Sequence, residues 1–522
     1  MQLKFMHAAV VLSLLGGASG FAACSSSSSR STTPKDGGAD ATADSDAAKP
    51  CTVNSECDDD DPCNGTETCD TGAGTCKAGT ALCDNPDPAH CDVTCDFNPG
   101  LTCGVVARDG DGDTHGDALC QQAPGLDCDD TNLKVFPGAN ETCDGVDSDC
   151  DGKADVDDGF ALGGTELTLV EQAATQVYAP SIAWAATAKK FGMTWRQGGH
   201  VWFGLLDESG TLSAVKQVSQ GTEAQGASIA SDGQNFAVVY DANDAGQFLA
   251  GRLYDSEGSP KTAPLKIALQ STSTDSRPQL TKNSDGWLLS FHAFDSVWVR
   301  KLKDDLSLDP AAELKLSAAG LAQFVAIAAG NTEHGLVYLP GYHPHDGISF
   351  SRVDATPTLI KTVSVDKALP ATARFDESSI AWTGDGWVGA ASGNGASGSI
   401  ALFEAAENGT IRCGATAITG PKGPFRLGNL ALNGSGRILP VVESAGPSGV
   451  AKLVRLDEKC TVLPSLELGA AAMPSFDAFF DRPFGPGISA AVGDTKIVVV
   501  WQGAKDGYFQ VKARIFGKNF CD

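Results

Sequence analysis

A-S-I-A at residues 227–230, N-F-A-V-V-Y at 235–240, Q-F-L-A-G-R-L-Y-D at 247–255 and P-L-K-I-A-L at 264–269 are the segments that decide the fold. Apolar residues alternate with others along each segment, and the turn sequence S-E-G at 256–258 separates the last two. Such alternation, interrupted by turn residues, is typical of short antiparallel strands. The stretch therefore predicts one unit of four antiparallel strands.

The first segment of this unit recurs along the second part of the chain. Its other copies are P-S-I-A-W at 180–184, R-P-Q-L-T at 277–281, V-A-I-A at 325–328, S-S-I-A-W at 378–382, G-N-L-A-L at 428–432 and I-S-A-A-V at 488–492. The result is seven copies of about fifty residues each. They predict an all-β fold, a seven-bladed β-propeller over residues 161–522, because ring closure removes exposed sheet edges. A pair of β-sandwiches is the structural alternative.

The two ends of the repeat region complement each other. The seventh unit has I-V-V-V-W at 497–501 and F-Q-V-K-A-R-I-F at 509–516, but no fourth strand follows. T-E-L-T-L-V-E-Q at 165–172 precedes the first unit and has the pattern of an orphan fourth strand. We therefore expect strand 165–172 to complete the last blade and close the ring.

Residues 104–160 are rich in aspartate, with a spacing that suits a hard cation. The loop D-S-D-C-D-G-K-A-D-V-D-D carries carboxylates at positions 1, 3, 5, 9 and 12 and Gly152 at position 6, as in a calcium-binding loop. Alternating aspartates allow a tight loop to turn several carboxylates toward one point, and glycine accepts the sharp bend. The candidate ligands of this second loop are Asp147, Asp149, Asp151, Asp155 and Asp158.

A first loop, D-G-D-G-D-T-H-G-D, has the same spacing with two departures. Thr114 stands where glycine is expected, and Cys120 occupies position 12. A carboxylate from Asp127, Asp129 or Asp130 would have to complete this site. The candidate ligands in the first loop are Asp109, Asp111, Asp113 and Asp117. One or two bound Ca²⁺ ions are predicted; an acidic solvated linker is the simpler alternative.

D-G-D-G-D at 109–113, C-D-D at 128–130, P-G-A-N-E-T-C at 137–143 and D-G-V-D-S-D-C-D-G at 144–152 closely resemble the metal-binding motif of bacterial surface proteins. The resemblance covers about fifty residues. It implies a cation-binding module outside the cytoplasm and does not imply catalysis. It also implies that cysteines pair among Cys120, Cys128, Cys143 and Cys150.

Residues 1–23 have the layout of a secretory signal, with Lys4 followed by an apolar run that is too short for a stable membrane span. Ala22 and Ala23 directly precede Cys24, which resembles a bacterial lipobox. The resemblance implies cleavage before Cys24 and lipid attachment to it, and Ser25 then implies the outer membrane or cell surface of a Gram-negative bacterium. A free Cys24 after ordinary cleavage is the alternative. Residues 24–50 lack large apolar side chains and are expected to form a disordered tether.

The cysteine count fits an oxidising compartment. Seventeen cysteines minus Cys24 leave 16, an even number. Nine of them lie in residues 51–103, which predicts a disulfide-stapled segment with little core and little regular structure. Cys413 and Cys460 are candidates for a structural disulfide, and Cys521 is the candidate for a bridge between the two halves of the chain.

Charge is concentrated in the first part of the chain. Residues 36–160 hold 30 acidic against 5 basic residues, a net charge of −25, whereas the whole chain carries −27. Bound cations would relieve the repulsion among these carboxylates. The same charge argues against nucleic acid as a partner.

The propeller region lacks G-x-S-x-G, H-E-x-x-H, a Walker loop and C-x-x-C-H. We therefore expect a non-enzymatic lipoprotein that binds calcium and displays a propeller to a protein or polysaccharide. One alternative is a secreted propeller enzyme, a glycan lyase or hydrolase. Its carboxylates would come from Asp376, Glu377, Asp385, Asp477 and Asp481. A copper-binding surface protein is the other alternative, with His115 or the pair His343 and His345 as ligands.

Overall fold

The computed structural model describes residues 49–521 in two compact units, Met1–Ala139 and Asn140–Asp522. Within that span the description omits 59–64, 81, 84, 86, 97–101, 143–145, 154, 158–160, 173–176, 222–224, 243–247, 269–276, 294–295, 317–321, 341–346, 366–374, 394–398, 420–424, 435, 446–447, 458–460, 473–486 and 506–507. The predicted signal, Cys24 and most of the tether therefore lie outside the described residues.

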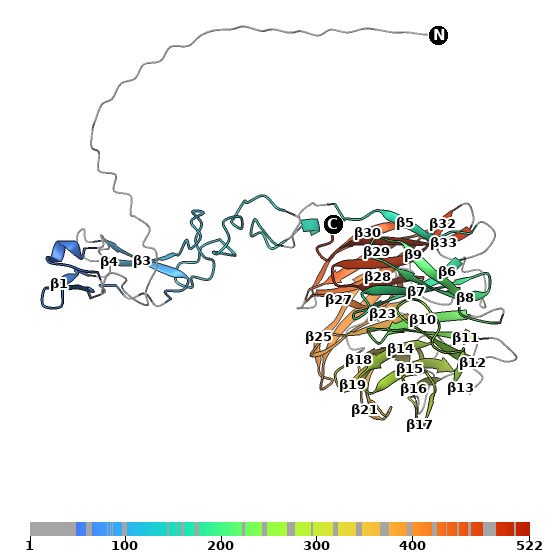
Figure 1. Ribbon diagram of the computed structural model, residues 1–522. Helices are drawn as coiled ribbons and strands as arrows, with labels where there is room; N and C mark the ends of the chain where they lie inside the picture. The colour runs from blue at the N-terminus through green and yellow to red at the C-terminus, as the bar shows by residue number, and fades with distance from the viewer. Residues whose placement is uncertain are drawn as a thin grey trace, which may run out of the picture. The chain divides into compact units, whose positions relative to one another are not determined.

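The first unit contains two small hairpins. A 3₁₀ turn, η2 (Asn54–Glu56), precedes the hairpin of β1 (Thr68–Asp70) and β2 (Thr75–Lys77), and a second hairpin joins β3 (Cys91–Asp96) to β4 (Thr102–Ala107) (Figure 1). Disulfides hold them together in place of a large apolar core. Among the described residues these disulfides include Cys51–Cys69, Cys57–Cys76, Cys83–Cys103 and Cys91–Cys120.

The last of these disulfides corrects one prediction. Cys120 pairs with Cys91 and not with Cys128, Cys143 or Cys150. The chain after β4 folds back on the start of β3, where the Arg108 N–H donates to His90 O (3.0 Å) and the Asp117 N–H donates to Arg108 O (2.7 Å). These bonds bring Cys120 beside Cys91, with a Cα–Cα distance of 5.1 Å.

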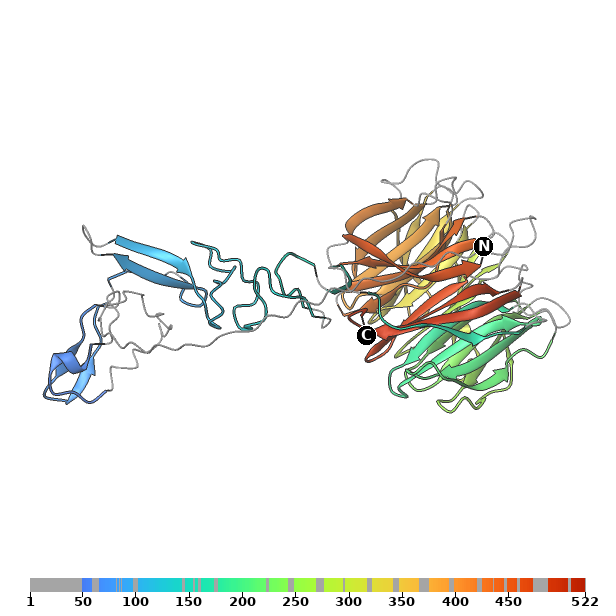
Figure 2. The same cartoon turned by 90° about the horizontal axis from the view of Figure 1, so that it is seen from above.

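The second unit is the predicted seven-bladed propeller (Figures 1 and 2). Each blade is an antiparallel sheet whose strands follow one another in chain order, except in the sixth and the last. The first four blades are β6 (Val177–Ala185), β7 (Lys190–Gln197), β8 (His200–Leu206), β9 (Leu212–Gln217); β10 (Gln225–Ser231), β11 (Phe236–Ala242), β12 (Phe248–Tyr254), β13 (Leu265–Ala268); β14 (Gln279–Asn283), β15 (Gly286–Ala293), β16 (Ser296–Leu302), β17 (Leu308–Lys315); and β18 (Ala322–Ala329), β19 (Glu333–Pro340), β20 (Ser349–Asp354), β21 (Leu359–Ser364).

The remaining three blades include the one that closes the ring. They are β22 (Phe375–Trp382), β23 (Gly386–Gly393), β24 (Ser399–Ala406), β25 (Ile411–Thr419); β26 (Phe425–Leu427), β27 (Ala431–Asn433), β28 (Gly436–Ala445), β29 (Ser448–Leu456), β30 (Val462–Ala472); and β31 (Ile488–Val492), β32 (Lys496–Lys505), β33 (Tyr508–Gly517), β5 (Glu166–Val170). The pairing of β5 with β33, with Thr168 opposite Lys512, confirms the predicted closure by strand 165–172.

The first strand of every blade lies innermost. Inner strands of neighbouring blades contact one another in order, and β31 contacts β6 to complete the circle. In the sixth blade the inner strand is split into β26 and β27. Pro440 of β28 lies opposite the break, and since proline has no N–H it cannot donate there. The Gly428 N–H instead donates to Pro440 O (2.8 Å).

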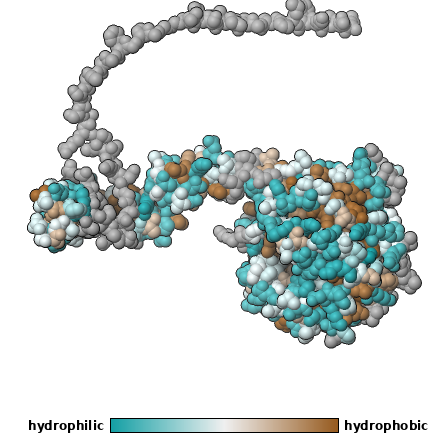
Figure 3. Space-filling model, in the orientation of Figure 1, coloured by the Kyte–Doolittle hydropathy of each residue, from teal (hydrophilic) through white to brown (hydrophobic). Residues whose placement is uncertain are grey.

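Apolar side chains pack between neighbouring blades. Trp195, Trp287, Trp387 and Trp501 are fully buried there, one on the second strand of each of four blades. The visible face of the molecule is hydrophilic over most of its area, with apolar residues in separate patches (Figure 3). Among the described residues, no helix has the length and hydropathy needed to cross a bilayer.

Candidate metal centre

The first acidic loop wraps its own backbone around the carboxylates. Asp109 Oδ1 accepts hydrogen bonds from the Gly112 N–H (2.8 Å) and the Asp113 N–H (3.1 Å), and its Oδ2 accepts from the Thr114 N–H (3.0 Å). The Asp113 N–H is also 3.1 Å from Asp111 Oδ1. As a result Asp109, Asp111 and Asp113 each place a carboxylate oxygen within 4.8 Å of the others.

The second loop repeats three of these backbone hydrogen bonds at the same positions. The Asp151 N–H donates to Asp147 Oδ1 (3.2 Å) and Asp149 Oδ1 (3.1 Å), and the Gly152 N–H donates to Asp147 Oδ2 (2.8 Å). Gly152 has a φ of +87° and Thr114, at the same loop position, has +81°. The first loop therefore adopts the left-handed bend without the glycine, which is unfavourable for a β-branched residue.

Two carboxylates from outside the first loop crowd its triad. Burial raises the pKa of Asp127, and the nearby Asp113 and Asp111 carboxylates raise it further. Burial likewise raises the pKa of Asp130, with added repulsion from Asp117, Asp111 and Asp109; the Gly110 N–H donates to Asp130 Oδ1 (2.8 Å). Asp127 and Asp130 are thus the carboxylates outside the loop that interact electrostatically with its aspartates, whereas Asp129 Oδ1 accepts from the Thr131 hydroxyl (2.6 Å).

Several of these carboxylate oxygens are buried with no protein donor. Among the described residues, Asp111 Oδ2, Asp113 Oδ2 and Asp127 Oδ2 have no hydrogen-bond partner. A buried carboxylate oxygen without a donor is costly, and neighbouring negative charges increase the cost. A cation among them would remove both penalties.

Asp117 has a different position from the one its spacing suggested. Its Oδ2 lies 2.5 Å from His90 Nδ1 and its Oδ1 accepts from the Leu119 N–H (2.7 Å). The hydrogen bond to Asp117 raises the pKa of His90. Asp117 therefore holds the loop to the β3 end of the first unit, and both of its oxygens are engaged.

The second site includes one carboxylate that the spacing argument did not single out. Glu141 Oε1 accepts from the Asp149 N–H (2.8 Å), and Glu141, Asp147 and Asp149 form a triad with oxygens within 4.8 Å. Glu141 Oε2 is buried without a hydrogen-bond partner in the described part of the chain. Glu141 belongs to the motif P-G-A-N-E-T-C at 137–143, so the resemblance to the metal-binding motif could have indicated it as a ligand.

Of the other three predicted ligands of the second loop, the two that the structure describes lie outside the triad. Asp151 is ion-paired with Lys153, whose hydrogen bond lowers the pKa of Asp151. Asp155 is buried at the start of η3 (Asp155–Asp157). Asp158 lies outside the described residues.

Asp157, the last residue of η3, joins the second acidic loop to the propeller. Its Oδ2 accepts from Arg455 Nη1 of β29 (3.0 Å), and Oδ1 accepts from Nη2 of the same side chain. The Arg455 guanidinium lies 5.2 Å from the Phe520 ring centroid, and the Gly163 N–H donates to Phe520 O (2.7 Å). The second acidic loop is therefore joined to the propeller close to the closing strand.

The donor set is composed of oxygen atoms. Oxygen-only clusters of three or more carboxylates suit Ca²⁺, Mg²⁺ or Mn²⁺, and soft metals prefer thiolate or imidazole. The cluster of Cys51, Cys57 and Cys76 does not offer thiolates, because these cysteines form disulfides. One imidazole lies near the first site: His115 Nδ1 is 3.3 Å from Asp113 Oδ1, and its ring stacks on Phe136 at 4.9 Å.

Residues 127–156 match a family model. The model is Cu-binding_MopE, described as "Putative metal-binding motif". No curated protein sequence matches the chain.

Solved structures resemble this chain at low similarity. They include Kluyveromyces lactis Hsv2 (12% identity, 65% of this chain and 98% of that chain, TM-score 0.35) and an ulvan lyase of polysaccharide lyase family PL25 (9%, 68% and 96%, 0.43). The periplasmic gluconolactonase of Pseudomonas aeruginosa is also similar (14%, 56% and 86%, 0.40).

The carboxylates predicted for the alternative of a propeller enzyme do not form one site among the described residues. Glu377 is buried, with Oε1 3.0 Å from Arg426 Nη1 and Oε2 accepting from the Leu427 N–H (2.6 Å). Asp385 lies in the β22–β23 turn, paired with Arg412 at 2.6 Å, which lowers the pKa of Asp385. The side chain of Asp376 and all of Asp477, Asp481, His343 and His345 lie outside the described residues.

The remaining cysteine predictions are met in part. Cys128, Cys150, Cys413 and Cys521 are all disulfide-bonded. Cys143 and Cys460 lie outside the described residues, and the bridge predicted for Cys521 stays a prediction.

Proposed function

We propose that this chain is a calcium-binding surface lipoprotein that holds a β-propeller outside the cell for contact with a protein or polysaccharide. The observation that carries the calcium assignment is the repeated loop geometry. Each of the two triads holds three carboxylate oxygens within 4.8 Å of one another, and in both loops the first aspartate accepts from the N–H of the sixth residue. Oxygen ligands in loops of this flexibility suit Ca²⁺ better than Mg²⁺, which demands near-octahedral geometry.

The display role draws on the position of the second site. Because Asp157 ties η3 to Arg455, a cation in the Glu141, Asp147 and Asp149 triad would stiffen the segment that enters the propeller. Lipid attachment at Cys24 and the tether up to residue 50 would then keep the unit near the membrane. The proposal is non-enzymatic; it draws on Glu377 and Asp385, the two described carboxylates considered for an enzyme, which pair with Arg426 and Arg412.

Copper binding is a second candidate, favoured by one observation. His115 offers an imidazole nitrogen beside Asp113 in the first site, and imidazole is a ligand that Cu²⁺ accepts readily. The second triad contains no imidazole. Copper binding would therefore be confined to the first site and would require His115.

Titration of the full-length, chelator-stripped protein with Ca²⁺ in a calorimeter, together with thermal unfolding, tests the proposal. We expect two binding events and a stabilisation of about 2.7 kcal/mol at a calcium concentration of 100 Kd. Asp147→Asn with Asp149→Asn should remove one event, and Asp304→Asn, an exposed carboxylate outside both loops, should leave both. Calcium without effect, or copper binding that Asp147→Asn and Asp149→Asn abolish, would contradict it.

A further inference from the structure

The propeller encloses a central channel lined by the inner strands of all seven blades. The cavity measures about 500 Å³, within the range of roughly 300–1,000 Å³ typical of ligand pockets. One position recurs around it, the second residue of each four-residue motif in the inner strands. The occupants, in blade order, are Ser181, Ser228, Gln279, Ala326, Ser379, Asn429 and Ser489. Six of the seven are small polar or amide residues.

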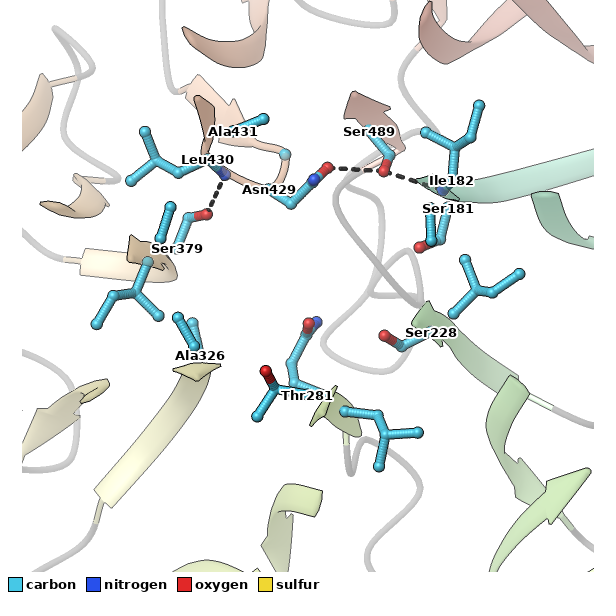
Figure 4. A pocket seen from close by; sticks show the side chains of 18 of the residues that line it. Ser181, Ile182, Ser228, Thr281, Ala326, Ser379, Asn429, Leu430, Ala431 and Ser489 are labelled. Carbon is cyan, nitrogen blue, oxygen red and sulfur yellow. Dashed lines mark hydrogen bonds between the residues drawn. The ribbon is translucent and has the colours of Figure 1, made fainter. Parts of the chain in front are cut away.

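In the last three blades this position is used to hold blades together. Ser379 Oγ accepts from the Leu430 N–H (2.7 Å), and Asn429 Oδ1 accepts from the Ala490 N–H (2.9 Å). Ser489 Oγ accepts from the Ile182 N–H (3.1 Å), which joins the seventh blade to the first. Figure 4 shows two of these contacts, at Ser379 and Ser489, as dashed lines between neighbouring blades.

In the first three blades the side chains at this position do not form hydrogen bonds between blades, as far as the described residues extend. Ser181, Ser228 and Gln279 line the channel without a side-chain hydrogen bond to any described residue. The hydroxyls of Ser181 and Ser228 point toward the open space of the channel (Figure 4). Ser228 is 7% exposed, and its hydroxyl is not among the buried side-chain atoms without a partner, so the hydroxyl is accessible from the channel.

The channel lining contains few charged side chains. Three charged residues reach it, and all are engaged elsewhere: Glu377 pairs with Arg426, and Lys282 pairs with Asp304 at 3.3 Å. Arg277 has an interaction of its own as well. Uncharged polar side chains therefore make up most of the hydrogen-bonding groups in the described lining.

We propose that the side of the central channel formed by the first three blades binds a neutral sugar residue. Hydroxyl and carboxamide groups each donate and accept, so Ser181, Ser228 and Gln279 can serve the adjacent hydroxyls of a sugar ring. Trp184 of the first blade also lines the channel and adds an apolar face for the ring's C–H side. This inference deepens the proposed display function by naming a neutral glycan as the ligand, and it rests on that function.

The test uses the full-length, calcium-loaded protein and four neutral disaccharides, maltose, cellobiose, lactose and mannobiose, at millimolar concentration in saturation-transfer NMR and calorimetry. At least one should bind. Ser228→Ala combined with Gln279→Ala should weaken that binding at least about tenfold, with little change in Tm. Ser379→Ala is the matched control in the same ring: it should lower Tm and retain the sugar.

Three outcomes would overturn the channel site. These are no binding by any of the four sugars, binding indifferent to Ser228→Ala with Gln279→Ala, or tighter binding of digalacturonate than of every neutral probe. The calcium titration distinguishes this failure from failure of the proposed function. If calcium still stabilises the protein while no sugar binds, only the channel inference falls.

Discussion

The contact between Asp157 and Arg455 should be worth several kcal/mol to the propeller. The Arg455 side chain is 6% exposed and that of Asp157 15%, so removal of either partner leaves a largely buried charge uncompensated. Loss of one member of a buried pair costs about 3–5 kcal/mol. We expect Arg455→Ala to cost more than Asp157→Ala, because Arg455 Nη2 also donates to Pro464 O (2.9 Å) and its guanidinium packs over Phe520.

The expected shift in melting temperature follows from the size of the unit. Residues Asn140–Asp522 unfold with an entropy of about 0.8 kcal/mol/K, at about 2.1 cal/mol/K per residue. A loss of about 3–5 kcal/mol therefore lowers Tm by about 4–6 °C. Differential scanning calorimetry of the two single variants and the double variant gives the coupling energy directly.

The control is an exposed pair near the same closing strand. Lys505 and Glu171 lie 2.9 Å apart but are 57% and 48% exposed, so Glu171→Ala should change stability by less than about 1 kcal/mol. The reasoning about the buried contact is refuted if Asp157→Ala behaves like Glu171→Ala. It is also refuted if the Asp157 and Arg455 effects add without coupling.

Three further changes have definite expected results. Thr114→Gly should relieve the left-handed bend by about 1 kcal/mol and tighten cation binding at the first site several-fold, measured by calorimetry. Burial lowers the pKa of His334 to about 4, so stability should be full above pH 6.5 and fall by about 3 kcal/mol as pH drops toward 4; His334→Phe should flatten that profile in urea unfolding. Glu377→Ala should destabilise the propeller by about 3 kcal/mol in the same assay, since Arg426 loses its buried partner.

The sequence predicted the propeller because its signals are local and repeated. The inner-strand motif occurs seven times, and each copy reports the same backbone pattern of alternation and turn. The closing strand followed from counting strands at the two ends, and its pairing with β33 confirms that count. The sequence did not predict the split of the sixth inner strand into β26 and β27. The split depends on Pro440 in the neighbouring strand and not on residues 428–430 themselves.

The sequence predicted only those metal ligands that lie at regular spacing within one loop. Aspartates at alternate positions of one loop can be read directly, and five of them belong to the two triads: Asp109, Asp111, Asp113, Asp147 and Asp149. Glu141 lies six residues before its loop and joins the site only through the fold, by accepting from the Asp149 N–H. The same limit applies to Cys91 with Cys120 and to Asp157 with Arg455. Those pairs are 29 and 298 residues apart, so no local pattern specifies them.

The place of the second site predicts that the two sites act on different parts of the protein. The Asp109, Asp111 and Asp113 triad belongs to the first unit, whereas the Glu141, Asp147 and Asp149 triad lies in the unit of the propeller. A cation that stabilises a folded unit raises the melting temperature of the unit it binds.

The chain should therefore show two separable calcium responses. Asp109→Asn with Asp111→Asn should remove the calcium response of the first unit and leave the propeller transition unchanged. Asp147→Asn with Asp149→Asn should lower the melting temperature of the propeller. Without calcium the second loop is less ordered, and the contact of Asp157 in η3 with Arg455 is weakened. Calorimetric scans with calcium and with chelator resolve the two cases. A propeller transition that ignores both pairs of substitutions would mean that the second site serves only its own loop, and the stiffening argument would fail.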